Sequence, residues 1–431
     1  MLPEGERPLW EHCHCTKGQE SMRKNHRGNR SEPEQPLSAG RIEYLEQARE
    51  RVRSRRIRRT AVIVVALTLV VLFTTGIVGS SVALAKDWVD TARIVLFPGT
   101  GWPQQTGVME LEQLAPMTGS FVELGEEGCV VYSRTGTRLN SIQSGYARPA
   151  LAAGKSRFVL YNRSGNELRV ESRTQNLYTK TFENSIYLCT IADSGTLAVV
   201  TEDAGSAARL LVYSSTMEQL LSWNMTITDG IPLRMTFSPD GRRLAVAAVT
   251  VNGGQMVTNF YVVTLAQGDP VLVGSQNGAA QWLSWPSAQG ILAVCDSRAV
   301  LYNVSGGERA AYDFTGQTLR DVSVDASGTA LLLVSGQLCQ AIMLDKDLNV
   351  QGNVSVQAAN HIVRAGSQFY LLTDNGVECL ASDGTSQWTQ SLSARPQGLL
   401  ADNKKQLLVF CGNTVQVLTP PEAENTAAGN T

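Results

Sequence analysis

A short apolar strand pattern recurs at nearly constant spacing along most of this 431-residue chain, and it constrains the fold more than any other feature. The clearest copies follow a polar turn, as in the segments that begin at Asp193 (DSGTLAVV), Ser238 (SPDGRRLAVA) and Asp325 (DASGTALLLV). Successive strand starts are 37 to 47 residues apart, at Phe121, Phe158, Leu197, Leu244, Ile291, Leu331, Phe369 and Leu407. This period matches a four-stranded propeller blade. We therefore predict an all-β fold, an eight-bladed β-propeller, with seven blades as the alternative.

A second apolar strand follows within each unit and ends in a polar turn. Examples are CVVYS from Cys129 and AVLYN from Ala299. Alternating apolar residues that end in a Gly or Asp turn are typical of β-hairpins. A helical solenoid can have a similar period, but the strands are rich in β-branched residues and the chain lacks ten-residue amphipathic runs. The pattern favours strands.

The last unit is short of one strand. It contains segments 398–401, 406–411 and 414–418, and a polar tail follows from Pro420. Residues 107–114 (GVMELEQL) precede the first unit and have no partner of their own. We predict that they complete the last blade, because closing the ring removes an exposed sheet edge. The expected boundaries are a linker at 86–106, the propeller at 107–418 and a disordered tail at 419–431.

An uncharged apolar stretch of 25 residues covers residues 61–85. As a helix it would be about 37 Å long, which exceeds the ~30 Å hydrocarbon core of a bilayer. Seven arginines precede it, and by the positive-inside rule they place the N-terminus in the cytoplasm and the propeller outside. We predict a single-span signal anchor and location at the cell membrane. A cleaved signal peptide, cut after Ala83-Leu84-Ala85, is the alternative, although its apolar region is normally shorter.

The residues before the span divide into two parts. Residues 1–40 are polar and poor in aliphatic side chains, so we expect a disordered cytoplasmic tail. Residues 41–60 are expected to form a basic juxtamembrane helix. The run His12, Cys13, His14 and Cys15 offers four soft ligands, but four adjacent residues cannot surround one tetrahedral ion. We expect no metal site there.

Residues 144–265 carry a resemblance to a known family. The turn Ser238-Pro239-Asp240-Gly241 before Leu244 resembles WD-type and quinoprotein-like propellers in general. Gly145-Tyr146, Leu160-Tyr161 and the strand from Leu197, together with an Arg-rich stretch and one span ahead of them, look like an uncharacterised, mostly clostridial family of membrane-anchored propellers catalogued as a domain of unknown function. The resemblance implies a propeller outside the membrane and transfers no site residue.

Several residue types could carry chemistry, and we interpret each as structural. Carboxylates in Gly- or Asn-containing turns cap the turn with their own side chains. Six stand within three residues of a Gly or Asn: Asp193, Asp240, Asp325, Asp374, Asp383 and Asp402. The segment from Asp345 to Asn349 begins like a calcium loop, but Val350 stands where Gly is needed and Val356 where Glu is needed. His361 is the only histidine of the predicted propeller, and no nucleophile elbow accompanies it.

Cysteines and tryptophans of the predicted propeller are also interpreted as packing residues. The even number of cysteines permits up to three disulfides, but buried thiols suit a core-rich fold; we favour free thiols at Cys129, Cys189, Cys295, Cys339, Cys379 and Cys411. Trp282, Trp285 and Trp388 could stack on a sugar or quinone, but propellers also pack one large residue per blade, and we favour packing. The sequons at Asn162, Asn224, Asn303 and Asn353 matter only in a eukaryote.

The charge distribution and the motifs of the sequence then narrow the classes of function that this protein can have. Residues 1–60 hold 14 Lys and Arg against 9 Asp and Glu, whereas the rest of the chain is mildly acidic, so we expect no nucleic-acid partner. The sequence assigns no catalytic residue and no metal ligand, leaves any cofactor-binding residue unknown, and indicates no cofactor. We predict a non-enzymatic scaffold or recognition module for envelope proteins or wall polymers. The alternatives are a quinoprotein-like or glycan-cleaving enzyme with its site in the propeller channel, and a receptor that signals through the helix to the basic tail.

Overall fold

The structure, a computed structural model, describes residues 89, 99–356, 358–401 and 407–419. The chain divides into two compact units, residues 1–75 and 76–431, and all the described residues belong to the second. The predicted span at 61–85, the juxtamembrane helix at 41–60 and the disordered tail at 1–40 lie outside them. Within the described part of the chain, no helix is both long enough and apolar enough to cross a membrane.

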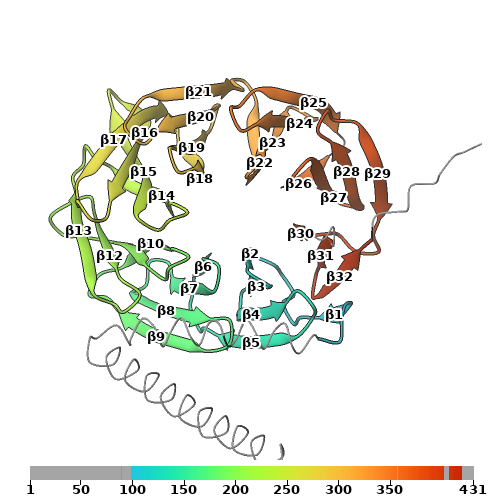
Figure 1. The fold of residues 1–431 in the computed structure, drawn as a ribbon, viewed down its shortest axis with the longest axis horizontal. Coiled ribbons are helices and arrows are strands. Elements are labelled where there is room, and N and C mark those ends of the chain that lie inside the picture. The colour runs from blue at the N-terminus through green and yellow to red at the C-terminus, as the bar shows by residue number, and fades with distance from the viewer. Residues whose placement is uncertain (1–88, 90–98, 357, 402–406, 420–431) are drawn as a thin grey trace, which may run out of the picture. The chain divides into compact units, whose positions relative to one another are not determined.

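The described residues form eight four-stranded antiparallel sheets arranged in a ring (Figure 1). We number these blades 1 to 8 along the chain. Blades 1 to 3 are β2 (Gln113–Met117), β3 (Ser120–Gly125), β4 (Gly128–Ser133) and β5 (Arg138–Gln143); β6 (Pro149–Ala153), β7 (Arg157–Asn162), β8 (Glu167–Ser172) and β9 (Asn176–Thr181); and β10 (Ile186–Ile191), β11 (Leu197–Thr201), β12 (Ala208–Tyr213) and β13 (Gln219–Met225).

The other blades follow the same plan. Blades 4 to 6 are β14 (Ile231–Phe237), β15 (Arg243–Asn252), β16 (Gln255–Thr264) and β17 (Pro270–Asn277); β18 (Ala280–Ser287), β19 (Gly290–Cys295), β20 (Arg298–Asn303) and β21 (Glu308–Asp313); and β22 (Thr318–Asp325), β23 (Gly328–Ser335), β24 (Leu338–Asp345) and β25 (Val350–Val356). Blade 7 is β26 (Ala359–Ala365), β27 (Gln368–Thr373), β28 (Gly376–Ala381) and β29 (Ser386–Ser391), and blade 8 is β30 (Gly398–Ala401), β31 (Leu407–Cys411), β32 (Thr414–Leu418) and β1 (Gln104–Gln105).

The predicted all-β, eight-bladed propeller is confirmed. Every strand start of the sequence repeat falls in the second strand of a blade, from Phe121 in β3 to Leu407 in β31. These strands are the most deeply buried of each sheet because blades cover both of their faces. A strand that is buried on both faces is apolar along its whole length, and for this reason the repeat was visible in the sequence.

As predicted, a segment that precedes the first unit supplies the fourth strand of the last blade, but it is not the segment that we expected. The fourth strand of blade 8 is β1, in which Gln104 pairs with Val415 and Gln105 with Thr414. The predicted closing segment, residues 107–114, was therefore wrong: it leads into β2, the innermost strand of blade 1, which starts at Gln113. Only two residues pair, and side chains complete the closure. The Phe121 ring of blade 1 meets the Phe410 ring of blade 8 edge-on at 5.2 Å between centroids.

Side chains of one blade satisfy the open inner edge of the next. In β22, Asp321, Ser323 and Asp325 accept hydrogen bonds from the backbone N–H groups of Ile362, Arg364 and Gly366, at 2.9, 3.0 and 2.7 Å respectively. This ladder joins blades 6 and 7 along the strands nearest the centre of the ring (Figure 1). Unpaired strand edges are thereby covered, so they cannot template aggregation.

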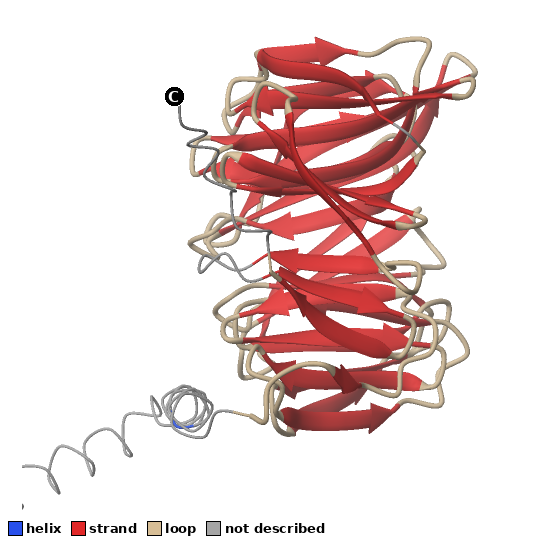
Figure 2. Cartoon of the chain, turned by 90° about the vertical axis from the view of Figure 1, so that its right-hand side faces the viewer, coloured by secondary structure: helices blue, strands red, loops and turns tan. Residues whose placement is uncertain are grey.

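The strands run across the thickness of the ring, and their connections gather on two faces (Figure 2). The top face carries the connections between the second and third strands of each blade and the connections between successive blades. The bottom face carries the connections between the first and second strands and between the third and fourth strands. The chain enters the ring at the bottom face, because the Gly99 and Gly101 N–H groups bond the Thr135 hydroxyl and carbonyl in the third-to-fourth turn of blade 1.

Candidate functional site, an apolar groove on the top face

One hairpin projects from the top face. The second and third strands of blade 4, β15 and β16, have ten residues each, whereas the corresponding strands of the other blades have five to eight. Asn252 pairs with Gln255, and the two residues between them, Gly253 and Gly254, have φ of +58° and +79°. Glycine adopts these angles without strain and makes the tight two-residue turn of a hairpin. β-Branched residues near the tip extend the ladder, so the hairpin reaches beyond the neighbouring blades.

A groove of about 1040 Å³ lies beside this hairpin, between blades 3 and 4. Three segments line it. The hairpin contributes Val249, Thr250, Val251 and Met256. The connection from blade 3 to blade 4 contributes Thr226, Ile227, Thr228, Gly230 and Ile231, and the turn between β11 and β12 contributes residues 204–207. None of these lining residues is titratable.

Large apolar side chains are exposed in the groove. The exposed fraction is 82% for Ile227, 72% for Val251, 53% for Met256 and 42% for Ile231. All four line the same groove. Val251 pairs with Met256 across the hairpin, and Ile231 pairs with Val249 of the same strand as Val251. Single exposed aliphatic residues are ordinary, but a contiguous apolar patch indicates a surface that binds another molecule.

Hydrogen bonds hold the groove in shape. The Thr250 hydroxyl donates to the Ile227 carbonyl at 2.7 Å, and the Asn259 side-chain amide donates to the Thr228 carbonyl at 3.1 Å. These bonds fix the connection that carries the most exposed side chain, Ile227, against blade 4. A preformed site loses less conformational entropy when it binds a partner than a site that must first order.

The Ser-Pro-Asp-Gly segment from Ser238 forms a turn, as predicted. The Gly241 N–H donates to the Ser238 carbonyl at 2.8 Å, the bond that defines a β-turn, and Gly241 has φ of +69°. Asp240 accepts hydrogen bonds from the Ser238 hydroxyl at 2.5 Å and the Arg242 N–H at 3.1 Å. The Ser238 bond lowers the pKa of Asp240. Asp240 Oδ1 is thus bonded within the turn.

The other aspartates lie apart from one another. Asp193 pairs with Lys155 at 2.7 Å, Asp374 with Arg395 at 3.0 Å, and Asp383 accepts from the Thr385 N–H at 2.9 Å. Asp345 accepts from the Asp347 and Asn349 N–H groups and so closes its own turn. Asp402 lies outside the described residues. Across the described ranges, no group of three or more His, Cys, Asp or Glu side chains could hold a metal ion.

His361 lies on the innermost strand of blade 7, where its Nδ1 is 3.3 Å from Asp321 Oδ2 of blade 6. The carboxylate oxygen also accepts the Ile362 N–H, as part of the ladder between these blades. The pair thus belongs to a contact between strands, as expected for a strand histidine. No hydroxyl or thiol nucleophile is bonded to His361 among the described residues.

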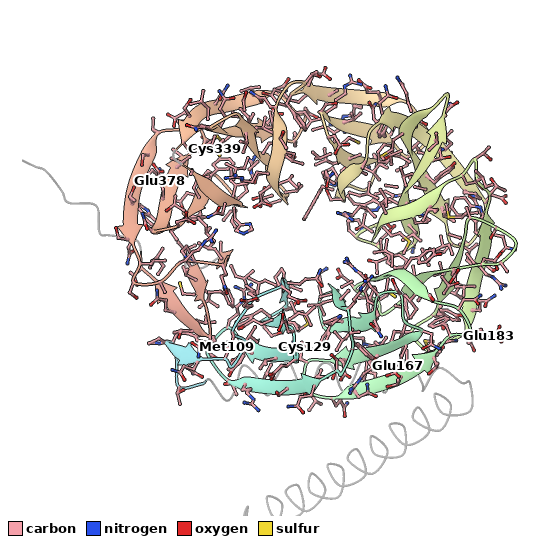
Figure 3. The ribbon with its side chains drawn as sticks, turned by 180° about the vertical axis from the view of Figure 1, so that it is seen from behind. Met109, Cys129, Glu167, Glu183, Cys339 and Glu378 are labelled. Atoms are coloured by element: carbon pink, nitrogen blue, oxygen red, sulfur yellow. The ribbon has the colours of Figure 1, made fainter. Side chains whose placement is uncertain are left out.

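All six cysteines of the propeller are buried free thiols. Cys129 and Cys339 lie in well-separated blades of the ring, as Figure 3 shows. Burial raises the pKa of the Cys129 and Cys295 thiols to about 12, so they are not reactive thiolates at neutral pH. They act as small apolar side chains.

Two of the three tryptophans pack between or within blades. The Trp285 indole donates to the Thr236 carbonyl of blade 4 at 3.0 Å, and the Arg243 guanidinium lies 5.3 Å from its ring. Trp388 packs against Tyr370, with 6.1 Å between ring centroids. Trp282 on β18 is exposed, so the expected packing role is not confirmed for this residue.

The groove itself was missed by the sequence analysis. Its one visible sign was the spacing of 47 residues on both sides of Leu244, larger than elsewhere in the repeat. The extra residues after Leu244 build the projecting hairpin. Exposure of Ile227 and Ile231 could not be predicted, because both follow strand-like apolar patterns that usually face a core.

Comparisons with known proteins agree with the fold. Residues 104–269 match the model of a family of unknown function (DUF5711). The propeller residues that carry the predicted resemblance, 144–265, fall inside this match, whereas the Arg-rich stretch and the apolar run at 61–85 lie outside it. No curated protein matches the chain. Among solved structures, the chain is similar to the C-terminal WD40 domain of Sif2, with a TM-score of 0.52 at 10% identity, covering 75% of this chain and 99% of that one.

A second similar structure is Sqt1 of Chaetomium thermophilum, bound to the N-terminus of the ribosomal protein L10. Its TM-score is 0.49 at 10% identity, covering 73% of this chain and 98% of that one. At 10% identity, the likeness to the Sif2 domain shows a shared fold alone. The chain is thus a β-propeller of WD40-like architecture that is similar, over residues 104–269, to a family of unknown function.

Proposed function

We propose that this protein is a membrane-anchored recognition module whose propeller, held outside the cytoplasm, binds another protein of the cell envelope through the groove between blades 3 and 4. The observation that carries the proposal is the contiguous apolar lining, with Ile227 and Val251 each more than two thirds exposed. Such a surface favours an apolar protein segment. A wall polymer rich in hydroxyl groups would find few hydrogen-bond partners along it.

The place of the groove supports this arrangement. The chain enters the ring at the bottom face, next to Thr135, and the groove lies on the top face. The first described segment of the chain and the groove therefore lie on opposite faces of the ring, so this segment leaves the groove accessible to a partner.

The enzyme alternative needs polar groups gathered in the channel. The innermost strands bring together the pair His361 and Asp321, whose groups bond the neighbouring strand. A quinoprotein or glycosidase requires a metal or a pair of carboxylates placed for acid and base roles. The geometry of the described residues supports binding rather than this chemistry.

The proposal is tested by crosslinking from the groove in whole cells. A photoreactive residue at position 251 should capture a specific envelope protein. The double variant Val251→Ser, Met256→Ser, which carries the photoreactive residue at position 231 instead, should not capture this protein. The matched control is Leu338→Ser, since Leu338 is 66% exposed at the turn of blade 6 on the same face. This variant should capture the partner at the level of the unmodified protein.

Capture that survives loss of both groove side chains would overturn the proposed site. Crosslinks to cytoplasmic proteins would overturn the proposed location. The captured protein should then be purified and shown to bind the full-length chain in detergent or nanodiscs, with the same dependence on Val251 and Met256.

A further inference from the structure

We propose that the occupant of the groove is an apolar segment flanked by Lys or Arg, because acidic residues border the apolar lining on two sides. The inference rests on the proposed function and names the residue types of the partner segment. It follows from the positions of two carboxylates and from the residue types that line the groove.

The first carboxylate is Asp203, in the turn that supplies residues 204–207 of the lining. Its Oδ2 accepts hydrogen bonds from the Ser206 hydroxyl at 2.7 Å and the Gly205 N–H at 3.2 Å, and both donors belong to lining residues. The Ser206 bond lowers the pKa of Asp203, so this group is charged at neutral pH. Asp203 is half-buried, and the exposed Glu202 precedes it in the chain.

The second carboxylate is Asp229, in the connection from blade 3 to blade 4. Its Oδ2 accepts from the Thr226 N–H and the Thr226 hydroxyl, both at 2.8 Å. Thr226, Thr228 and Gly230 all line the groove, so this carboxylate lies within the same segment as the exposed Ile227. Both carboxylates are held by hydrogen bonds within their own turns, and Asp229 Oδ1 also accepts from the Tyr261 hydroxyl at 3.5 Å.

Basic residues are scarce at this surface. No Lys or Arg lines the groove. Arg209 is the cation whose charge acts on Asp203, and its Nε is engaged with the Ser222 hydroxyl at 3.2 Å. Asp203 and Asp229, both bonded to lining residues, therefore outnumber it. Complementary charge at the rim sets partner choice and association rate more than total affinity.

The same charges disfavour three other occupants. The C-terminal residues 420–431 contain Glu422 and Glu424 and no Lys or Arg, and Leu418 ends the third strand of blade 8 toward the bottom face. An anionic lipid surface would be repelled by the acidic rim. A second copy of the propeller would bring the same acidic rim to the contact.

The test is a selection of random 12-residue peptides displayed on phage against the full-length chain in nanodiscs. Peptides are kept when they bind both the unmodified chain and the Leu338→Ser variant. Their affinity for the double variant Val251→Ser, Met256→Ser must be at least tenfold lower. We expect these groove-dependent peptides to carry Lys or Arg beside an apolar core, well above the frequency in the starting library.

The acidic rim is then tested directly with a selected peptide. Asp203→Asn and Asp229→Asn keep an acceptor oxygen for the turn, and each should weaken peptide binding about threefold. Added salt should weaken peptide binding to the unmodified chain, because it screens the two carboxylates. The matched control, Glu126→Gln on the exposed top turn of blade 1, should leave the affinity unchanged.

Each result has a distinct meaning. Groove-dependent peptides with no excess of Lys or Arg, or with excess Asp or Glu, would overturn the charge inference and leave the proposed function in place. A selection that yields no groove-dependent peptide would overturn docking of a protein segment, and the proposed function with it. Groove-dependent self-association in light scattering, or binding to lipid vesicles, would overturn the inference in favour of a second copy or a membrane.

Discussion

The Thr106 hydroxyl donates a hydrogen bond of 2.8 Å to Glu123 Oε2, and this bond ties the segment that closes the ring to the second strand of blade 1. Thr106 directly follows β1, and its N–H donates to the Asn413 carbonyl of blade 8 at 2.8 Å. Glu123 is 1% exposed, and its Oε1 has no hydrogen-bond partner among the described residues. A buried carboxyl thus lies at the seam where the first and last blades meet.

The first prediction is a pH-dependent stability difference for Glu123→Gln. Burial raises the pKa of Glu123 from 4.5 to about 7, while the Thr106 hydrogen bond opposes the shift. The folded state therefore favours the protonated acid, a contribution that is complete below pH 4.5 and is lost as the pH rises to 7. Relative to Glu123→Gln, the unmodified chain should lose roughly 3 kcal/mol of unfolding free energy over this window.

Chemical denaturation at several pH values measures this difference. The exposed Glu126→Gln serves as the control and should show a constant offset. A stability gap for Glu123→Gln that does not change between pH 4.5 and 7 would contradict the account of the seam.

The second prediction concerns the buried ion pair between blades 6 and 7. Arg364 Nε lies 3.1 Å from Asp325 Oδ1, and the Arg364 side chain is 3% exposed. Asp325→Asn leaves the guanidinium buried without its counter-charge, so the unfolding free energy should fall by about 2 kcal/mol. In Asp374→Asn, which breaks the exposed pair with Arg395, it should change by less than about 0.5 kcal/mol. Equal effects of the two variants would contradict the assigned difference in burial.

The third prediction concerns the turn from β14 to β15. Gly241 has φ of +69°, and a Cβ there would lie 3.2 Å from the Ser194 hydroxyl of blade 3. Gly241→Val should therefore lower the unfolding free energy by at least about 1 kcal/mol, because a β-branched residue is strained at this φ. Asp240→Asn should change it by less than about 1 kcal/mol, because Asn also caps turns. Thermal unfolding measures both, and reduced partner binding by a fully folded Asp240→Asn protein would reveal a site rather than a turn.

How much of this structure the sequence could predict depended on burial. The blade count, the second strands from Phe121 to Leu407 and the turn at Gly241 were predictable, because core strands and glycine turns leave strong local patterns. The closing strand was not. It has two residues, Gln104 and Gln105, without apolar pattern, and contacts more than 300 residues away in the chain select it. The groove depends on which apolar residues the neighbouring blade leaves uncovered, and no local pattern encodes that.

The fourth prediction tests the topology. All six cysteines of the propeller are buried, so they give little background with a thiol reagent. A membrane-impermeant maleimide applied to whole cells should label Glu126→Cys, on the exposed top face, and should reach Cys13 and Cys15 only after permeabilisation. Labelling of the two native cysteines in intact cells, with Glu126→Cys protected, would reverse the proposed orientation.

The most direct test of the groove as the recognition site is the dissociation constant between the full-length chain and the protein captured from the groove. Val251 and Met256 are 72% and 53% exposed, and truncation of a side chain at the centre of an interface commonly costs more than about 1 kcal/mol. The account predicts at least a tenfold rise in the dissociation constant for Val251→Ser, Met256→Ser, and no change for Leu338→Ser. Equal affinity of the groove variant and the unmodified chain would contradict it.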